Sequence, residues 1–372
     1  MKERDWQKYL RKSRLLPVEP CPLNATVQLV AVIPACDELE EIGDTLDSLF
    51  PAEDEAVLVV VNHPADASAR VRNASAELLK KLRSGAFPRR NLYWIDAPDL
   101  TGGVGEARKL GMDAVIAAQP PEQLENTIFA SLDADAVVES DYFSEIRVWF
   151  ENDPSLAALS IPFRHQTGAT PEEETAIRIY EAYLNRYVEK LRQAGSPYAF
   201  QTVGSAFAVR MSAYVRAGGM RVRKGGEDFY FLQAVAKTGK VASGDRVLVH
   251  PSSRPSARVP FGTGPAVRKL MDGIAPTEIS DAAFETVKNL LRHAGNPALL
   301  EDAELFLSEL DPIPYAFLRE EGFAAVWPKV LKNTPDRHEA RQAAFHSWFD
   351  GLRTLRLLHR LDQSIETIKN ER

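Results

Sequence analysis

Short apolar runs alternate with helical patterns along the first third of the chain. Runs of strand length cover residues 27–33, 56–61 and 92–95, and apolar residues at helical spacing cover 39–49 and 66–83. An uninterrupted apolar run is typical of a strand buried on both faces. Strands that alternate with helices favour right-handed crossovers and ligand sites at the carboxyl ends of the strands. We therefore predict an α/β fold with a mainly parallel sheet flanked by helices.

A fourth apolar run, residues 127–132, ends in the acidic pair Asp133 and Asp135. One residue separates the two acids, so in an extended segment both lie on the same face, where the pair need not share a role. One carboxylate can hold Mg²⁺ or Mn²⁺ while the other accepts hydrogen bonds from a sugar hydroxyl. A solvated strand end is the alternative interpretation, and the two acids alone do not decide between them.

A glycine-rich segment, residues 101–111, lies between the third and fourth runs. Gly105 and the basic residue Arg108 are placed where a phosphate or a sugar could approach backbone amides at the start of a helix. The segment is not a dinucleotide fingerprint, because Arg108 stands where the third glycine is required, and no P-loop lysine follows. A tight loop that begins a helix would explain the same residues.

Two further segments carry candidate chemistry. Residues 204–210 form a strand pattern of small residues, which is typical of a place where a ligand approaches closely. Glu227 and Asp228 open a helix after two glycines. Their charges could simply complement the helix dipole. Alternatively, the glycines could let one of the two carboxylates project into a pocket and act as a general base.

His250 ends the last strand-like run, residues 245–250, directly before a loop that contains Arg254 and Arg258. A metal ligand beside two phosphate-binding guanidinium groups is one interpretation of this order, and an unremarkable histidine is the other.

Composition excludes several classes of partner. The chain of 372 residues has 45 basic and 52 acidic side chains and a net charge of −7, so it lacks the basic surface that nucleic acid requires. Two cysteines favour a reducing compartment. No apolar run approaches the roughly 20 residues of a transmembrane helix, and residues 1–6 do not resemble a signal peptide, so we expect a cytoplasmic protein.

The two ends of the chain differ from its middle. Residues 1–26 are polar and proline-rich and predict an arm on the surface. From residue 265 onward the pattern is helical, and we expect a C-terminal extension that either packs on the sheet domain or forms a homo-oligomer contact. The predicted helices cover residues 279–294, 298–310, 315–332 and 336–369. The predicted divisions are 1–26, 27–264 and 265–372.

The order of these motifs resembles that of the family 2 glycosyltransferases. Five motifs carry the resemblance: residues 33–38, 103–111, 133–136, 204–210 with 218–219, and 227–228. The resemblance implies a GT-A fold, which binds nucleotide-diphospho-sugars, and transfer of a sugar to an acceptor hydroxyl. The donor would be UDP- or GDP-linked, and the acceptor a sugar, a lipid or a small molecule.

The resemblance also implies roles for individual residues. Asp135 would bind the divalent metal, Mg²⁺ or Mn²⁺, and Asp133 would contact the ribose or the sugar. Asp228 would deprotonate the acceptor, and Glu227 would orient it. The remaining donor contacts would come from Pro34, Glu38, Asn62, Gly105, Arg108, Arg254 and Arg258, with His250 as a further metal ligand.

Some features leave alternatives open. The family usually has an aspartate at the end of the second strand, where this chain has Asn62, so the base could be uracil or guanine. Residues 250–264 are also similar to retaining enzymes of the mannosylglycerate synthase type, in which Asp228 need not be a base, but we expect inversion. A nucleotidyltransferase would need a glycine-rich loop after the first strand, which residues 35–38 do not form. A non-catalytic nucleotide-sugar-binding module would have little use for four acids at residues 133, 135, 227 and 228.

Overall fold

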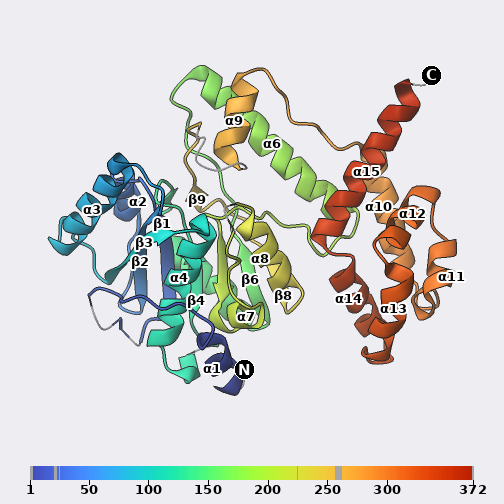
Figure 1. Cartoon of the computed structure of the whole chain (residues 1–372), viewed down its shortest axis with the longest axis horizontal. Helices are drawn as coiled ribbons and strands as arrows, with labels where there is room; N and C mark the ends of the chain where they lie inside the picture. The colour runs from blue at the N-terminus through green and yellow to red at the C-terminus, as the bar shows by residue number, and fades with distance from the viewer. Residues whose placement is uncertain are drawn as a thin grey trace. The chain divides into compact units, whose positions relative to one another are not determined.

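The structure, a computed structural model, describes residues 3–20, 23–24, 26–123, 125–223, 225–255 and 262–370. The chain divides into two compact units. The first consists of Met1–Glu181 and Phe200–Ala275, and the second of Ala182–Ala199 and Pro276–Arg372. The sheet lies in the first unit and most of the C-terminal helices lie in the second (Figure 1).

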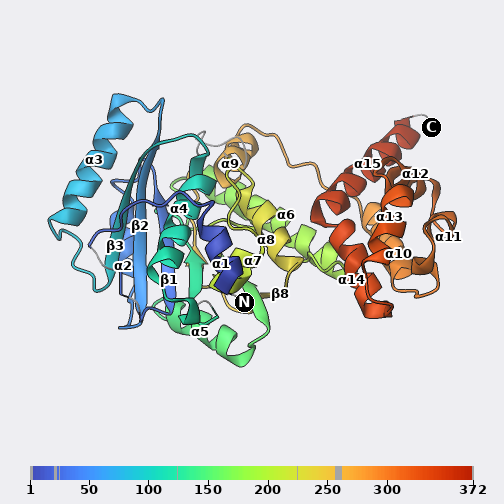
Figure 2. The same cartoon turned by 60° about the horizontal axis from the view of Figure 1, so that its bottom comes forward.

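Seven strands form the main sheet, in the order β3-β2-β1-β4-β7-β6-β8 (Figures 1 and 2). β7 runs antiparallel to both of its neighbours, and the other pairs are parallel. The strands are β1 (Leu29–Ala35), β2 (Glu55–Pro64), β3 (Leu92–Leu100), β4 (Ile128–Ser131), β6 (Leu156–Ser160), β7 (Phe207–Arg210) and β8 (Lys240–Ser243). This sheet confirms the predicted α/β fold class.

Helices of the first unit cover both faces of the sheet. They are α1 (Glu3–Leu10), α2 (Ile42–Ser48), α3 (Ala69–Arg83), α4 (Gly103–Ala118), α5 (Tyr142–Asn152), the first part of α6 (Pro171–Gln193), α7 (Met211–Arg216), α8 (Glu227–Ala236) and α9 (Thr263–Met271), with a short 3₁₀ turn η1 at Pro121–Gln123.

Alternate strand residues face different helices, as the two-residue period of a strand requires. Residues 29, 31 and 33 of β1 share a core with buried residues of α2, α3 and α5. On the other face α4 approaches closely at Gly111, where a Cβ would lie 2.6 Å from Val32 Cγ1 and 2.8 Å from Val60 Cγ2. A side chain at this position would push α4 away from the sheet. Glycine therefore allows the close packing that brings the first turn of α4 near the strand ends.

The last predicted strand, 245–250, is shorter than expected. Only β9 (Val249–His250) is extended, and it pairs antiparallel with β5 (Val137–Val138) in a separate two-stranded sheet. This pairing brings the segment after the acidic pair next to His250. The short strands β6 and β8 were not predicted.

The predicted N-terminal arm contains helix α1 and is anchored at two points. The Tyr9 hydroxyl donates a hydrogen bond to Asp113 Oδ1 at 2.6 Å, and it accepts one from Lys109 Nζ at 2.7 Å. Further along, Glu19 and Trp94 exchange two backbone hydrogen bonds at the free edge of β3. The arm therefore covers a sheet edge that would otherwise expose unpaired backbone groups.

The second unit is helical, as predicted for this part of the chain, and is built on an aromatic core that includes Phe306, Phe323, Trp327 and Phe345. Its elements are the end of α6, α10 (Asp281–Ala294), η2 (Leu299–Glu301), α11 (Ala303–Ser308), α12 (Pro312–Glu320), α13 (Phe323–Lys332), α14 (His338–Trp348) and α15 (Gly351–Asn370).

Three of the four predicted C-terminal helices are wrong, because each is interrupted. Residues 298–310 are divided between η2 and α11 at Asp302, whose side chain caps α11. Residues 315–332 are divided between α12 and α13 at Gly322, which has a φ of 80°. Residues 336–369 are divided between α14 and α15, and Asp350 Oδ1 accepts a hydrogen bond from the Arg353 amide at 3.2 Å at the start of α15.

Candidate active site

The predicted site residues gather at the carboxyl ends of β1 and β4. These strands are parallel neighbours, and the chain leaves β1 toward β2 on its other side, so the two ends form a topological switch point. Ligands of open α/β sheets bind at such points. Glu38 follows the end of β1, and Asp133 and Asp135 follow the end of β4.

Arg108 joins two of the predicted acids. Its guanidinium donates from Nη2 to Asp133 Oδ1 and from Nη1 to Glu227 Oε1. The Arg108 side chain is only 3% exposed and that of Glu227 only 4%. Arg108 Nε is buried without a hydrogen-bond partner among the described residues. Arg108 therefore holds α4, the loop after β4 and the start of α8 together.

Gly105 lets α4 approach the segment that leads into α8. A Cβ on Gly105 would lie 2.4 Å from the Arg221 carbonyl oxygen and 3.0 Å from Glu227 Cβ. The glycine was predicted to contact the donor. In this structure its Cα faces protein backbone, and the donor-binding role stays a prediction.

Asp228 lies beside this pair in the first turn of α8, and the residue is half-buried. Its Oδ1 accepts a hydrogen bond from the Phe229 amide at 2.7 Å. Loss of hydration raises the pKa of Asp228 to about 7, and the neighbouring charges of Glu227 and Asp133 add to the rise while Arg108 opposes it. A carboxyl group with a pKa near neutrality is suited to accept and release a proton at physiological pH.

A second arginine, Arg254, forms ion pairs with the other acids of the site. Arg254 Nη2 lies 2.5 Å from Glu38 Oε2 and 3.0 Å from Asp135 Oδ2. Nη1 of the same guanidinium pairs with Glu41 Oε1. Burial opposes the charged form of Arg254, but the three carboxylates outweigh it, so its pKa is raised. One cation therefore brings together carboxylates from the ends of β1 and β4.

His250 is placed close to Asp135 through the backbone. The Gln166 side-chain amide donates to the carbonyl oxygens of Asp135 and His250, both at 2.9 Å. The two ring nitrogens of His250 lie 2.9 Å from the Arg164 carbonyl oxygen and 2.8 Å from Glu139 Oε1. To act as a metal ligand, the imidazole would have to exchange one of these contacts, so its predicted role remains to be tested.

The other predicted donor contacts lie at or near the ends of β1 and β2. Pro34 is buried within β1, and Asn62 is buried within β2, where its Nδ2 donates to the Val60 carbonyl oxygen at 2.9 Å. Arg258 lies outside the residues that the structure describes.

Two contributors to the site were missed by sequence reasoning. Glu41 follows Glu38 by three residues, a spacing that places both acids on the same side of a helical turn and could have indicated them together. Gln166 lies in a loop after β6 with no recognisable motif around it, so its role could not be predicted.

The donor types present suit a hard divalent cation. Asp135, Glu38 and Glu41 supply carboxylate oxygens, which Mg²⁺ and Mn²⁺ prefer, and all three face the same guanidinium. Across the ranges that the structure describes, no three His, Cys, Asp or Glu side chains are already arranged around a metal position. A metal held by Asp135 would therefore have to take over the charge that Arg254 now supplies.

The sheet order, the single antiparallel strand β7 and the acids after β4 agree with the GT-A fold implied by the motifs. No described helix of the chain is both long enough and apolar enough to cross a membrane.

Comparison with known proteins gives weak similarities only. No family model and no curated protein matches the chain. Among solved structures, S. aureus TarS 1-349 in complex with UDP-GlcNAc is 14% identical and covers 87% of this chain and 90% of its own, with a TM-score of 0.44. The mannosyltransferase PcManGT from Pyrobaculum calidifontis in complex with GDP-Man and Mn²⁺ is 17% identical over 94% of both chains, with a TM-score of 0.43.

A third similar structure is glucosyl-3-phosphoglycerate synthase from Mycobacterium tuberculosis in complex with Mn²⁺ and UDP-Glc. It is 15% identical and covers 68% of this chain and 82% of its own, with a TM-score of 0.37. Since all of these TM-scores lie below 0.5, the chemistry of the chain has to be inferred from its own residues.

Proposed function

We propose that the chain is a glycosyltransferase that moves a sugar from a UDP- or GDP-linked donor to an acceptor hydroxyl with the help of Mg²⁺ or Mn²⁺. The main support is the position of Arg108, which ties Asp133 and Glu227 together beside Asp228 at the switch point of the sheet. An ion pair with this little exposure is costly to bury and adds little to stability, which favours a functional reason for it.

In this proposal Asp228 is the general base. It takes the proton from the acceptor hydroxyl while the hydroxyl oxygen bonds to the anomeric carbon and the bond to the diphosphate breaks. This single displacement inverts the configuration of that carbon and releases a nucleoside diphosphate. Glu227 is held by Arg108 and would position the acceptor, and Asp133 would accept hydrogen bonds from the ribose or the sugar.

The donor diphosphate would bind between Arg254 and the acids around it. Arg254 would exchange one of its carboxylate partners for the donor phosphate. A phosphate, like a carboxylate, can accept two hydrogen bonds from one guanidinium group. Asp135 would hold the metal, which when bound supplies positive charge to the leaving diphosphate.

The first test is binding. UDP-GlcNAc, UDP-Glc and GDP-Man should each be added with and without Mn²⁺ while the melting temperature is followed, since a ligand specific for the folded protein raises it. One of these donors or a close relative should stabilise the parent protein, and Asp135→Ala should lose the part that depends on Mn²⁺.

The second test is turnover. Donor hydrolysis by Asp228→Asn should fall at least about 100-fold below that of the parent, the usual contribution of a general base. Asp135→Ala should also lower it, because the metal ligand is lost. Equal turnover in all three proteins would exclude the proposed mechanism. The anomeric configuration of the product, measured by NMR, separates inversion from the retaining alternative, in which Asp228 is not a base.

A further inference from the structure

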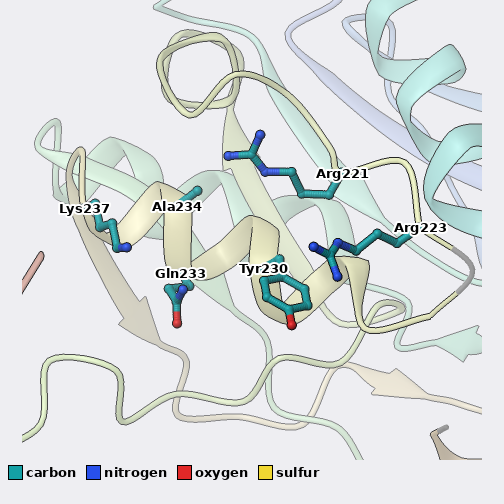
Figure 3. Close-up of a pocket in the computed structure, with 6 residues that line it drawn as sticks. All are labelled: Arg221, Arg223, Tyr230, Gln233, Ala234 and Lys237. Carbon is teal, nitrogen blue, oxygen red and sulfur yellow. The ribbon is translucent and has the colours of Figure 1, made fainter. Parts of the chain in front are cut away.

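A basic pocket lies on helix α8, apart from the proposed base. It has a volume of about 190 Å³ and is lined by Arg221, Arg223, Tyr230, Gln233, Ala234 and Lys237 (Figure 3). Three of these six residues are basic and none is acidic. This local excess of positive charge stands in a chain whose net charge is −7, so it is not a consequence of composition.

The two arginines of the pocket differ from those of the active site. Arg108 and Arg254 are each bound by two or more carboxylates. Arg221 and Arg223 are exposed, and neither forms an ion pair with any acid in the described ranges of the chain. Arg221 Nη2 contacts only the Ala217 carbonyl oxygen, at 3.5 Å, among the described hydrogen bonds. Their charges are therefore available to a ligand.

Tyr230 orients one of these charges. The Cζ atom of Arg223 lies 4.0 Å from the centre of the Tyr230 ring, and Figure 3 shows the Arg223 side chain extending toward that ring. Stacking of this kind restrains a guanidinium while its edge, with the N–H donors, stays free to bind a planar or tetrahedral anion. The arrangement costs less entropy on binding than two freely rotating arginines would.

We propose that this pocket binds a phosphate group, either free or as the monoester of a small molecule. Two guanidinium groups can donate paired hydrogen bonds to phosphate oxygens, and charge-assisted bonds of this type are the strong ones. The volume of about 190 Å³ leaves space for a small organic part beside the phosphate. A pocket of this size is too small to be a nucleic-acid surface.

The pocket lies apart from the proposed catalytic residues, but its backbone packs against the segment that contacts Glu227. At about 100° per residue, Tyr230, Gln233 and Lys237 lie on one face of α8 and Asp228 on the opposite face. The backbone of Arg221, however, packs on Gly105, which also contacts Glu227. A bound phosphate that restrains this segment would therefore also restrain Glu227. The phosphate-site proposal does not depend on the glycosyltransferase proposal.

The test measures binding of inorganic phosphate and glycerol phosphate to the full chain by calorimetry and thermal shift, with sodium chloride at equal ionic strength as reference. Arg221→Gln/Arg223→Gln should weaken phosphate binding at least about tenfold. The control Lys80→Gln/Arg90→Gln removes the same charge from exposed positions elsewhere and should bind like the parent.

Two outcomes would overturn the proposal: chloride that stabilises the protein as much as phosphate, or unchanged phosphate affinity in the Arg221/Arg223 variant. Arg223→Lys keeps the charge but removes the stacked fork, and it should lose part of the affinity. Binding of free phosphate and of the monoester would both support the site, and the stronger of the two identifies the source of the phosphate group.

Discussion

Gly204 lies directly against the guanidinium group of Arg108. A Cβ atom on Gly204 would be 2.6 Å from Nη2 and 2.9 Å from both Cζ and Nη1. Because Asp133 and Glu227 hold the two ends of the same guanidinium, it has no free direction in which to move. The position of Arg108, which joins the acids of the site, therefore explains why residue 204 is a glycine.

Gly204→Ala should displace Arg108 and weaken at least one of its ion pairs. We expect a loss of about 1–3 kcal/mol in the free energy of unfolding, the usual cost of overpacking, and a fall in donor turnover. Gly43→Ala is the matched control, because a Cβ at that helical glycine meets no atom within 4 Å. Urea unfolding checks both variants, and equal effects would contradict the role assigned to Gly204.

Arg108→Met should be among the most destabilising single substitutions in the sheet unit. It leaves the buried carboxylate of Glu227 without its cation, which costs about 3–5 kcal/mol when one partner of a buried pair is removed. Adding Glu227→Gln should restore part of the stability, because the uncompensated charge is then gone. Arg90→Met, at an exposed arginine paired with Glu53, should change stability by less than about 0.5 kcal/mol. No recovery in the double variant would argue against the pair.

The sequence allowed the sheet to be predicted because its central strands are buried on both faces and therefore apolar throughout. β6 and β8 were missed: β8 has only four residues, and its side chains are partly exposed, so its pattern is indistinct. The break between α14 and α15 had a signal, since Asp350 interrupts an otherwise continuous helical pattern and acts at a helix start.

The site was predictable in its residue types but not in its pairings. Motif order singled out Arg108, Asp133 and Glu227, yet no spacing rule indicates that residues up to 119 positions apart share one guanidinium. The same holds for Arg254, which meets Glu38 from a distance of 216 positions. Long-range ion pairs depend on how the strands are ordered, and that order is fixed only by the complete fold.

Arg254→Met should change how the protein responds to divalent cations. The substitution removes the cation that Asp135, Glu38 and Glu41 share, and their mutual repulsion is then relieved by any metal that binds among them. Without donor, Mn²⁺ should therefore raise the melting temperature of Arg254→Met more than that of the parent. Donor affinity should fall in the same variant, because a phosphate partner is lost.

The control for this prediction is Arg246→Met, which removes an arginine bound to Asp141 on the surface. Its response to Mn²⁺ should equal that of the parent. If Arg254→Met also responds like the parent, the three carboxylates are not a cation site, and the metal assignment to Asp135 fails while the assignment of Asp228 is unaffected.

The raised pKa of Asp228 predicts how the stability of the protein depends on pH. The folded protein holds the proton up to a pH of about 7, whereas the ordinary aspartate pKa is 3.8, so the native state binds more protons than the unfolded state between these values. The contribution of Asp228 is therefore most favourable below about pH 4, and it decreases as pH rises toward 7. Asp228→Asn removes this dependence, so its stability relative to the parent should increase from pH 5 to pH 8.

Urea unfolding at several pH values measures this difference, and Asp245→Asn, at an exposed aspartate, is the control that should show no such trend. The activity of the parent should rise with pH with a midpoint near 7, because only the ionised carboxylate can take the acceptor proton. A stability difference that is flat across this range would mean that Asp228 is ionised normally despite Glu227 and Asp133 beside it. A stability trend without a matching activity profile would instead keep the raised pKa and remove Asp228 from the role of base.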